Sequence, residues 1–172
     1  MLDIDLTITE PPMPSILFIC TANRFRSPLA QAMFRLALED SRTAESWTVD
    51  SAGTWATSGM AVLPAVAVIA RQYNLDLSQH RSKEVTGKIL AAHDLILVME
   101  AGHKEALLHE FSLYAEHIHL LSQVADERQY NIPDAIESFA SMAGVAKDLH
   151  SLIQTGFDHI CDKAHQLQRK PH

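Results

Sequence analysis

Nine consecutive residues, positions 20–28, read CTANRFRSP and concentrate a thiol, two guanidinium groups and two hydroxyls. Cys20 precedes Arg26 by six positions, and a helix is expected to begin close to the arginine. Successive backbone N–H groups in such a turn and at a helix N-terminus favour negative charge, and a nearby arginine adds to this effect. The guanidinium of Arg26 can bind two phosphate oxygens at once. The segment therefore predicts a cysteine thiolate that faces a phosphate or a similar oxyanion.

A simpler interpretation makes Cys20 a small buried residue at the end of a strand and Arg26 part of a solvated helix face. The surrounding sequence favours the anion site instead. The apolar run 16–19 predicts a buried strand that ends at the cysteine. Ser27 and Pro28 predict a helix start, with the serine as the cap and the proline at the first helical position. A strand, a turn and a helix in this order are typical of an anion site at the turn.

Apolar periodicity along the chain predicts alternating strands and helices. The expected strands are residues 16–19, 47–50, 95–99 and 118–121, and the expected helices are residues 28–39, 63–73, 105–111 and 139–167, the last open to interruption at Gly156. Such alternation implies a parallel α/β sheet with right-handed crossovers. Ligands of these sheets bind at the carboxyl ends of the strands, where Cys20 is expected to lie.

Length and composition indicate one domain, residues 15–172, behind a short extension, residues 1–14. The chain has 172 residues, of which 47% are hydrophobic and 20% are charged, and its net charge is −7 with a pI of about 5.7. This acidic balance argues against a nucleic-acid partner. The extension is acidic, holds three prolines and lacks the basic start and apolar core of a signal peptide.

Cysteine usage and hydropathy indicate the cellular compartment in which the protein acts. The two cysteines lack metal-ligand spacing, so neither a disulfide framework nor a metal site is expected. No uninterrupted apolar stretch reaches about 18 residues, so no membrane partner is expected. A reactive thiol needs a reducing compartment, which indicates a cytoplasmic protein. The second cysteine, Cys161, falls on the apolar face of the last predicted helix and is expected to be a core residue.

Five segments, in this order along the chain, resemble the low-molecular-weight protein tyrosine phosphatase family. They are residues 20–28, residues 51–55 with the sequence SAGTW, His80 with Arg81, residues 94–99, and the triplet Ile132, Pro133 and Asp134. The resemblance covers about residues 16–167. It implies a three-layer α/β fold, with a four-stranded parallel sheet flanked by helices and a phosphate loop after the first strand. It also implies hydrolysis of phosphomonoesters, on phosphorylated proteins or small aryl phosphates, without a metal or other cofactor.

The resemblance implies a role for each matched residue. Cys20 is the nucleophile that forms a phosphocysteine intermediate, Arg26 binds the phosphate, and Asp134 is the general acid and then the general base. Asn23 holds an unusual loop conformation, and Ser27 donates a hydrogen bond to the thiolate. The implied phosphate-binding loop contains Thr21, Ala22, Asn23, Arg24, Phe25 and Ser27, the supporting network contains Ser51 and His80, and Trp55 forms an aromatic wall for the substrate ring.

Each assignment has a simpler structural alternative. Asp134 could be an ordinary turn residue after a proline, and His80 is one of ten histidines and could be purely structural. Ser27 could serve only as a helix cap. Asn23 could be an incidental turn residue, and Trp55 could belong to the core.

Four departures separate this chain from an average member of the family. Ala22 and Phe25 stand where glycine and a second cysteine are common, and without that cysteine no local disulfide can protect the nucleophile from irreversible oxidation. Arg24 adds a charge, expected at the rim of the loop, where it meets acidic substrate residues, pairs with a carboxylate such as Glu137, or is solvated. After Asp134 the family commonly has proline and aromatic residues, whereas this chain continues with the letters AIE.

The whole sequence predicts a cytoplasmic phosphatase, with phosphotyrosine proteins as the first expected substrates. An arsenate reductase of the same fold is one alternative, although it would need a supply of redox-active thiols. A phosphate-binding module with weak or no turnover is a second, and a phosphatase for phosphoarginine or another phosphoresidue is a third. The sequence predicts neither the physiological substrate nor the oligomeric state.

Overall fold

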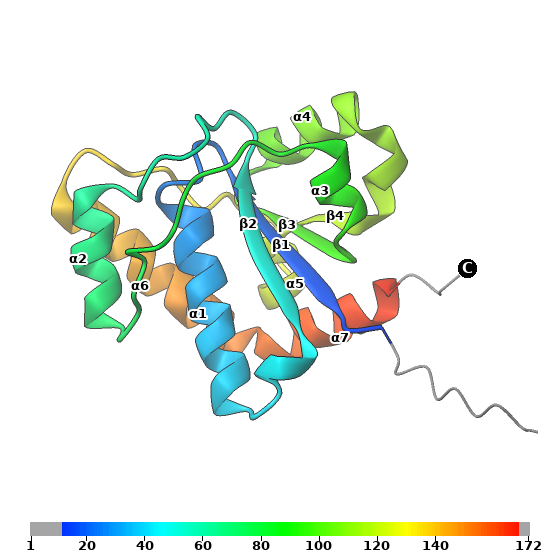
Figure 1. Cartoon of the computed structure of the whole chain (residues 1–172), viewed down its shortest axis with the longest axis horizontal. Coiled ribbons are helices and arrows are strands. Elements are labelled where there is room, and N and C mark those ends of the chain that lie inside the picture. Colours follow the sequence, from blue (N-terminus) through cyan, green and yellow to red (C-terminus); the bar gives the residue numbers. More distant parts are fainter. Residues whose placement is uncertain (1–11, 169–172) are drawn as a thin grey trace, which may run out of the picture.

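A sheet of four parallel strands forms the centre of the molecule in the computed structural model, which describes residues 12–168 (Figure 1). The strands are β1 (Ser15–Cys20), β2 (Thr48–Gly53), β3 (Leu95–Val98) and β4 (Ile118–Leu120), in the spatial order β2-β1-β3-β4. All neighbouring pairs are parallel. Cys20, the last residue of β1, pairs with Gly53, the last residue of β2. The predicted four-stranded parallel sheet is therefore confirmed.

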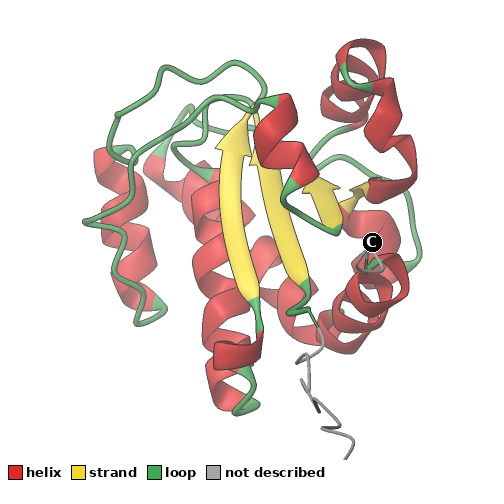
Figure 2. Ribbon diagram, turned by 45° about the vertical axis from the view of Figure 1, so that its right-hand side comes forward, coloured by secondary structure: helices red, strands yellow, loops and turns green. Residues whose placement is uncertain are grey.

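Helices cover both faces of the sheet and complete three layers (Figure 2). One layer contains α1 (Arg26–Asp40), α2 (Pro64–Gln72), α5 (Leu121–Asp126), α6 (Phe139–Thr155) and α7 (Phe157–Leu167), and the other contains α3 (Gly87–Ala91) and α4 (Ala101–Glu110). Two 3-10 segments, Ala44–Ser46 and Ser112–His117, precede β2 and β4. Successive side chains of a strand point to opposite faces, so Ile16 and Phe18 join the first core and Leu17 and Ile19 join the second.

The helix bounds differ from those predicted. α1 begins at Arg26 rather than at residue 28, and α4 begins at Ala101 rather than at residue 105. The sequence does not predict α3 and α5, because elements of five and six residues show no clear helical period. The physical signal for a helix weakens at its ends and in such short pieces.

The predicted interruption at Gly156 is present between α6 and α7. A Cβ atom at this position would lie 2.6 Å from the Cα atom of Ala125 in α5, which is closer than real side chains approach. The glycine therefore lets α5 pack directly against the junction of the two last helices.

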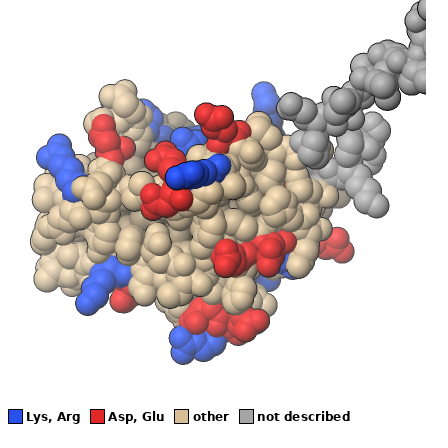
Figure 3. Space-filling view, turned by 90° about the horizontal axis from the view of Figure 1, so that it is seen from below, with Lys and Arg blue, Asp and Glu red and all other residues tan. Residues whose placement is uncertain are grey.

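The surface carries charges of both signs. On the face shown in Figure 3, acidic and basic side chains of the described residues lie interspersed rather than in one field. Within residues 12–168, none of the helices combines the length and the apolar character that a membrane span requires. Most of the predicted N-terminal extension, residues 1–11, lies outside the described residues.

Candidate active site

The loop that joins β1 to α1 is fixed by the segment that follows β2. Asn23 in this loop has a φ of 55°, in the left-handed region that asparagine tolerates better than most residues. The carbonyl oxygens of Cys20 and Thr21 accept hydrogen bonds from the N–H groups of Thr54 and Trp55, each at 2.9 Å. These bonds hold the first part of the loop against the end of the neighbouring strand.

Gly53 makes this close approach sterically feasible. A Cβ atom at position 53 would clash with the carbonyl oxygen of Thr21, and it would lie 2.8 Å from the Cβ atom of Ala56 and 3.1 Å from the backbone nitrogen of Asn23. Only a residue without a side chain fits there. The packing of the loop therefore depends on this glycine, to which the sequence assigns no specific role.

A chain of directed hydrogen bonds connects the thiol of Cys20 to the protein interior. The side-chain amide of Asn23 donates its two hydrogens to the hydroxyls of Ser27, at 2.9 Å, and Ser51, at 3.0 Å. Because the Ser27 oxygen accepts from Asn23, its own hydrogen has two acceptors within reach, the Cys20 sulfur at 3.0 Å and the carbonyl oxygen of Ala52 at 3.4 Å. Ser51 donates in turn to the side-chain oxygen of Gln31, at 2.7 Å. When the Ser27 hydrogen points at the sulfur, it is a donor that can stabilise negative charge there.

Ser27 does not occupy the predicted cap position. α1 begins at Arg26, so Phe25 is the cap residue and has no side-chain hydrogen bond, while Pro28 is the third helical residue. A proline is tolerated there because the first N–H groups of a helix have no intrahelical partner. The interpretation of Ser27 as a helix cap is therefore wrong, and its hydroxyl faces the thiol of Cys20 instead.

The segment 80–83 holds Asn23 from the other side. The side-chain oxygen of Asn23 accepts the N–H of Lys83 at 3.0 Å, and its carbonyl oxygen accepts a hydrogen bond from Nε2 of His80 at 2.8 Å. Burial is the main cause that lowers the pKa of His80 below its usual value. The structure thus brings His80 and Ser51 together around Asn23.

Arg26 is buried, with 1% of its side chain exposed, and its guanidinium is held along one edge. Nη1 donates to the carboxylate of Glu100 and to the carbonyl oxygen of Ile132, the latter at 2.7 Å. These bonds use both hydrogens of Nη1. Nε makes no hydrogen bond to any residue in the described range and lies 3.3 Å from Oδ1 of Asp134. The edge formed by Nε and Nη2 is therefore the one that can bind two phosphate oxygens.

Asp134 is half exposed, and the residues that precede it set its position. The N–H of Ile132 donates to the carbonyl oxygen of Met99, just after β3, at 2.8 Å. The side-chain oxygen of Asn131 accepts the N–H of Ala101 at 2.8 Å. Both anchors lie before Asp134, so the unusual residues after it leave the attachment of this segment intact.

Trp55 and Arg24 are two further residues of the predicted site. Trp55 is 83% exposed, so the alternative that it belongs to the core is wrong. Nε of Arg24 donates to the carbonyl oxygen of Ala61 at 2.8 Å, and the carbonyl oxygen of Arg24 accepts the N–H of Leu63 at 3.1 Å. Within the described part of the chain no ion pair joins Arg24 to Glu137, so the alternative in which these two residues pair is wrong.

The sequence gives no prediction for Glu100 and His103, although both contact the site. Glu100 binds Arg26, and Nε2 of His103 lies 2.9 Å from Oγ1 of Thr21. Burial is the largest cause that lowers the pKa of His103, followed by the positive charge of Arg26. Their position in the sequence could have indicated this role. Glu100 and His103 follow β3, which pairs with β1 in parallel, and the carboxyl ends of neighbouring parallel strands lie together.

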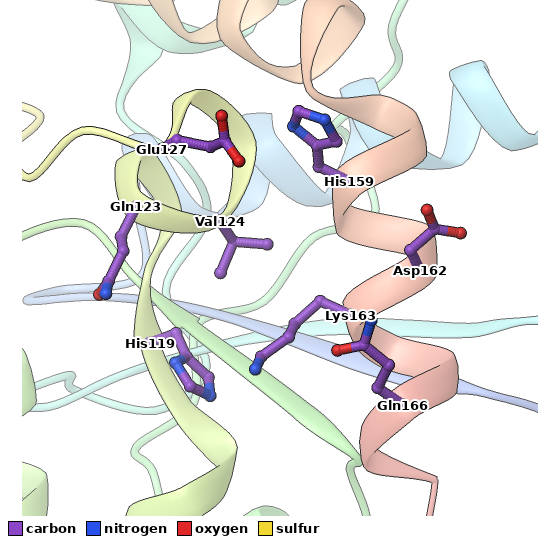
Figure 4. Close-up of a pocket in the computed structure, with 8 residues that line it drawn as sticks. All are labelled: His119, Gln123, Val124, Glu127, His159, Asp162, Lys163 and Gln166. Atoms are coloured by element: carbon purple, nitrogen blue, oxygen red, sulfur yellow. The ribbon is translucent and has the colours of Figure 1, made fainter.

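A separate cavity of about 380 Å³ lies between the β4–α5 segment and α7 (Figure 4). Its lining residues are His119, Gln123, Val124, Glu127, His159, Asp162, Lys163 and Gln166. The cavity mixes acidic and basic groups and shares no residue with the network around Cys20. Among residues 12–168, no cluster of three or more His, Cys, Asp or Glu side chains is placed to hold a metal ion.

Comparisons with known proteins agree on one family. The family described as low molecular weight phosphotyrosine protein phosphatase matches residues 15–169. The probable low molecular weight protein-tyrosine-phosphatase EpsP of Ralstonia solanacearum is 31% identical over 144 residues, which cover 84% of this chain and 91% of that protein. A protein-arginine-phosphatase of Bacillus subtilis is 30% identical over 108 residues, which cover 63% of this chain and 70% of that protein. Two further tyrosine-phosphatase relatives align over 60% and 58% of their own lengths.

A solved structure shares the whole architecture. The low molecular weight protein tyrosine phosphatase from T. tengcongensis is 26% identical and superposes with a TM-score of 0.77, covering 87% of this chain and 98% of that chain. The family match spans almost all of the described residues, and the sheet order and the loop after β1 agree with it. The chain therefore belongs to the low-molecular-weight phosphotyrosine protein phosphatase family of hydrolases.

Proposed function

We propose that this chain hydrolyses phosphate monoesters on proteins, with phosphotyrosine as the principal substrate class, through a phosphocysteine intermediate. The observation that carries the proposal is the arrangement of three groups, of which Cys20 and Arg26 come from one short loop and Asp134 comes from a distant part of the sequence. The sulfur of Cys20 faces the hydroxyl of Ser27. The Nε–Nη2 edge of the buried Arg26 lies beside Asp134. In the proposed mechanism these residues supply the nucleophile, the clamp for phosphate oxygens and the proton donor.

In the first step the thiolate of Cys20 attacks phosphorus, and the bond between phosphorus and the ester oxygen breaks. Asp134 donates a proton to the departing oxygen, so a tyrosine side chain leaves as the neutral phenol. Arg26 and the N–H groups of the loop bind the equatorial oxygens, on which negative charge gathers in the transition state. The product of this step is a phosphocysteine at position 20.

In the second step a water molecule attacks the phosphorus of the phosphocysteine. Asp134, now a carboxylate, accepts a proton from this water. The bond between sulfur and phosphorus breaks, inorganic phosphate leaves and the thiolate of Cys20 is restored. The hydrogen bond from Ser27 stabilises the sulfur as it departs, because it favours the anion over the covalent intermediate.

The substrate class follows from the mouth of the site and from the relatives. The exposed Trp55 offers an aromatic face against which the ring of a phosphotyrosine can pack. Phosphoarginine proteins are a second candidate class, favoured by the similarity to the protein-arginine-phosphatase of Bacillus subtilis.

The properties of the second thiol, that of Cys161, argue against the arsenate-reductase alternative. Burial, together with the negative charges of Asp158 and Asp162, raises the pKa of Cys161 to about 12. A thiol held in this protonated form is a poor nucleophile in disulfide exchange. We also infer that residues 15–172 act as one catalytic domain in the cytoplasm, where reducing conditions keep Cys20 active.

The test is turnover of a panel of peptides that share one sequence and carry phosphotyrosine, phosphoserine or phosphoarginine, with and without a chelator. Cys20→Ser and Cys161→Ser form the matched pair. We expect phosphotyrosine turnover that resists the chelator, that Cys20→Ser abolishes and that Cys161→Ser preserves. Arg26→Lys should be severely impaired, because an ammonium group cannot reproduce the two-oxygen contact.

Other outcomes would replace the proposal with a specific alternative. Turnover confined to phosphoarginine would change the substrate class and keep the mechanism. Phosphate binding without turnover of any peptide would support a binding module. Arsenate-dependent oxidation of a thiol donor would support a reductase, and turnover that requires a metal ion would contradict the phosphocysteine mechanism.

A further inference from the structure

His103 lies at the junction of α4 and the phosphate loop, and none of the chemical steps above uses it. Its side chain is buried, with 7% exposed, yet both ring nitrogens have polar partners. Nδ1 accepts the N–H of Glu100 at 3.2 Å, and Nε2 lies 2.9 Å from Oγ1 of Thr21. Thr21 directly follows the proposed nucleophile. The ring therefore connects the start of a helix to the loop that surrounds the phosphate.

The partners of His103 define its protonation state. A backbone N–H can only donate, so Nδ1 presents its lone pair to Glu100, and the single hydrogen of the neutral ring lies on Nε2. Nε2 then donates to Thr21. A protonated ring would place a second N–H against the N–H of Glu100 and break this arrangement. Arg26, Glu100 and Asp134 are the charged groups that act on the ring, and burial and Arg26 lower its pKa, which favours the neutral form near neutral pH.

The same helical turn fixes the carboxylate of Glu100. This carboxylate accepts the backbone N–H of His103, while the ring of His103 accepts the backbone N–H of Glu100, so the two residues form a reciprocal capping box. The carboxylate also accepts from Nη1 of Arg26. The orientation of Glu100, and with it the edge of the guanidinium that faces the phosphate, thus depends on this turn.

We propose that His103 is a positioning residue of the active site, which in its neutral form holds the phosphate loop through Thr21. Through the capping box it also holds Glu100, and thereby the guanidinium of Arg26. The inference rests on the proposed function, because it assumes that phosphate binds inside this loop. A histidine that only filled space would need neither hydrogen bond.

Two substitutions of His103 test the roles of its two ring nitrogens separately. The side chain in His103→Asn can place an oxygen near the position of Nδ1 but cannot reach Thr21. The longer side chain in His103→Gln can place an amide N–H near the position of Nε2 and keep the contact with Thr21. Thr21→Val removes the acceptor and keeps the shape. His109→Asn is the matched control, because His109 is an exposed residue of the same helix.

The measurements are the affinity for orthovanadate and kcat/KM for an aryl phosphate. The loss of one hydrogen bond should weaken both by about fivefold to tenfold in His103→Asn and in Thr21→Val. The double variant should lose little more than either single variant, because both remove the same contact. His103→Gln should lose less than His103→Asn, and His109→Asn should match the parent. Nitrogen-15 chemical shifts of the His103 ring should report a hydrogen on Nε2 and should move in Thr21→Val.

Two results would overturn the proposal. One is a double variant whose losses multiply, since independent effects would show that the contact between His103 and Thr21 is not the cause. The other is a His103→Asn protein that matches His109→Asn in both measurements. The vanadate affinity and the nitrogen-15 signals need no turnover, so a parent protein that binds vanadate and hydrolyses nothing would remove the proposed function and still test the role of His103.

Discussion

Asp134 is the single residue whose proposed role is most open to a kinetic test. Asp134→Asn keeps the size of the side chain and removes its proton, so turnover of phenyl phosphate should fall by about 10²–10⁴-fold. The loss should shrink steadily for aryl phosphates with more acidic phenols, because such leaving groups need less protonation. The measurement is kcat/KM across a series of substituted aryl phosphates, because kcat/KM reports the step in which the phenol leaves, whereas kcat also includes hydrolysis of the common phosphocysteine.

The control for this series is Glu137→Gln, since Glu137 is an exposed carboxylate three positions further along the chain. This variant should follow the parent for every leaving group. An equal loss for good and poor leaving groups in Asp134→Asn would show that the aspartate is structural, and the search for the acid would then turn to its neighbours.

Arg24 belongs to the same loop, and its side chain is partly exposed, so its charge is available to a substrate. Its Nε is bound to the carbonyl oxygen of Ala61, and its other nitrogens make no hydrogen bond within residues 12–168. Arg24→Ala should therefore raise KM more for phosphopeptides with acidic flanking residues than for neutral ones, with little change in kcat. Exposed charge pairs are worth about 0–1 kcal/mol, so the difference should be modest and should fade as salt is added.

Arg71→Ala is the matched control, because Arg71 is an exposed arginine of α2 outside the phosphate loop. It should leave the ratio of the two KM values unchanged. If both classes of peptide respond alike to Arg24→Ala at low salt, Arg24 has no role in recognition. A collapse of kcat would instead place Arg24 in the catalytic cradle.

At the scale of elements, the sequence predicted the parts whose signal is local. β1 and β3 are fully buried, and a continuous apolar run is the expected signature of a strand covered on both faces. The loop after β1 is also local, because the thiol and the guanidinium come from one short segment. Helices α3 and α5 escaped prediction because they are too short to show a period.

The contacts that complete the site are not local. Arg26 binds the carbonyl oxygen of Ile132 across 106 positions, and Thr21 meets His103 across 82 positions. Apolar periodicity indicates which strands exist, but it does not say which side chains meet where strands end. Asp134 was predicted only through the resemblance to a family. The sequence held no independent physical reason to place it near Arg26.

Gly53 supplies a prediction at the same scale. In Gly53→Ala the new methyl group would meet the carbonyl oxygen of Thr21 and the side chain of Ala56, so the phosphate loop must shift. Orthovanadate affinity and kcat/KM should both fall by about tenfold or more, as expected when groups that bind the transition state move by about 1 Å. The measurement is a titration with orthovanadate alongside steady-state kinetics.

The control is Gly144→Ala in α6, where a Cβ atom would have no heavy atom within 4 Å. Alanine in a helix interior should raise the free energy of unfolding by about 0.5–1 kcal/mol and leave the kinetics unchanged. Normal vanadate binding in Gly53→Ala would mean that the loop does not depend on this close approach.

At the scale of the whole molecule, three histidines should make the free energy of unfolding depend on pH. Burial is the first cause that lowers the pKa values of His80, His103 and His119 below the usual 6.5. The unfolded chain therefore binds these protons more readily than the folded chain does. The contribution of the three groups is fully present above about pH 6.5 and is lost as the pH falls below that value.

The free energy of unfolding, measured by urea denaturation, should therefore decrease between pH 7.5 and pH 5.5. This window lies above the usual pKa values of carboxyl groups, so histidines dominate the titration there. A double variant with His80→Asn and His119→Asn should show a shallower decrease than the parent. An identical slope in the two proteins would show that these histidines do not account for the dependence.

The exposure of Trp55 gives the protein a built-in optical reporter. The chain has two tryptophans, and the other, Trp47, packs edge-on against Phe34 at 6.1 Å and against the ring of His165 at 5.1 Å. Trp55 instead lies in solvent beside the proposed site, so we expect its fluorescence to have the red-shifted emission of a hydrated indole. In a Trp47→Phe background, with excitation at wavelengths that tyrosine does not absorb, Trp55 is the only emitting residue, and binding beside it can be followed in real time without a label.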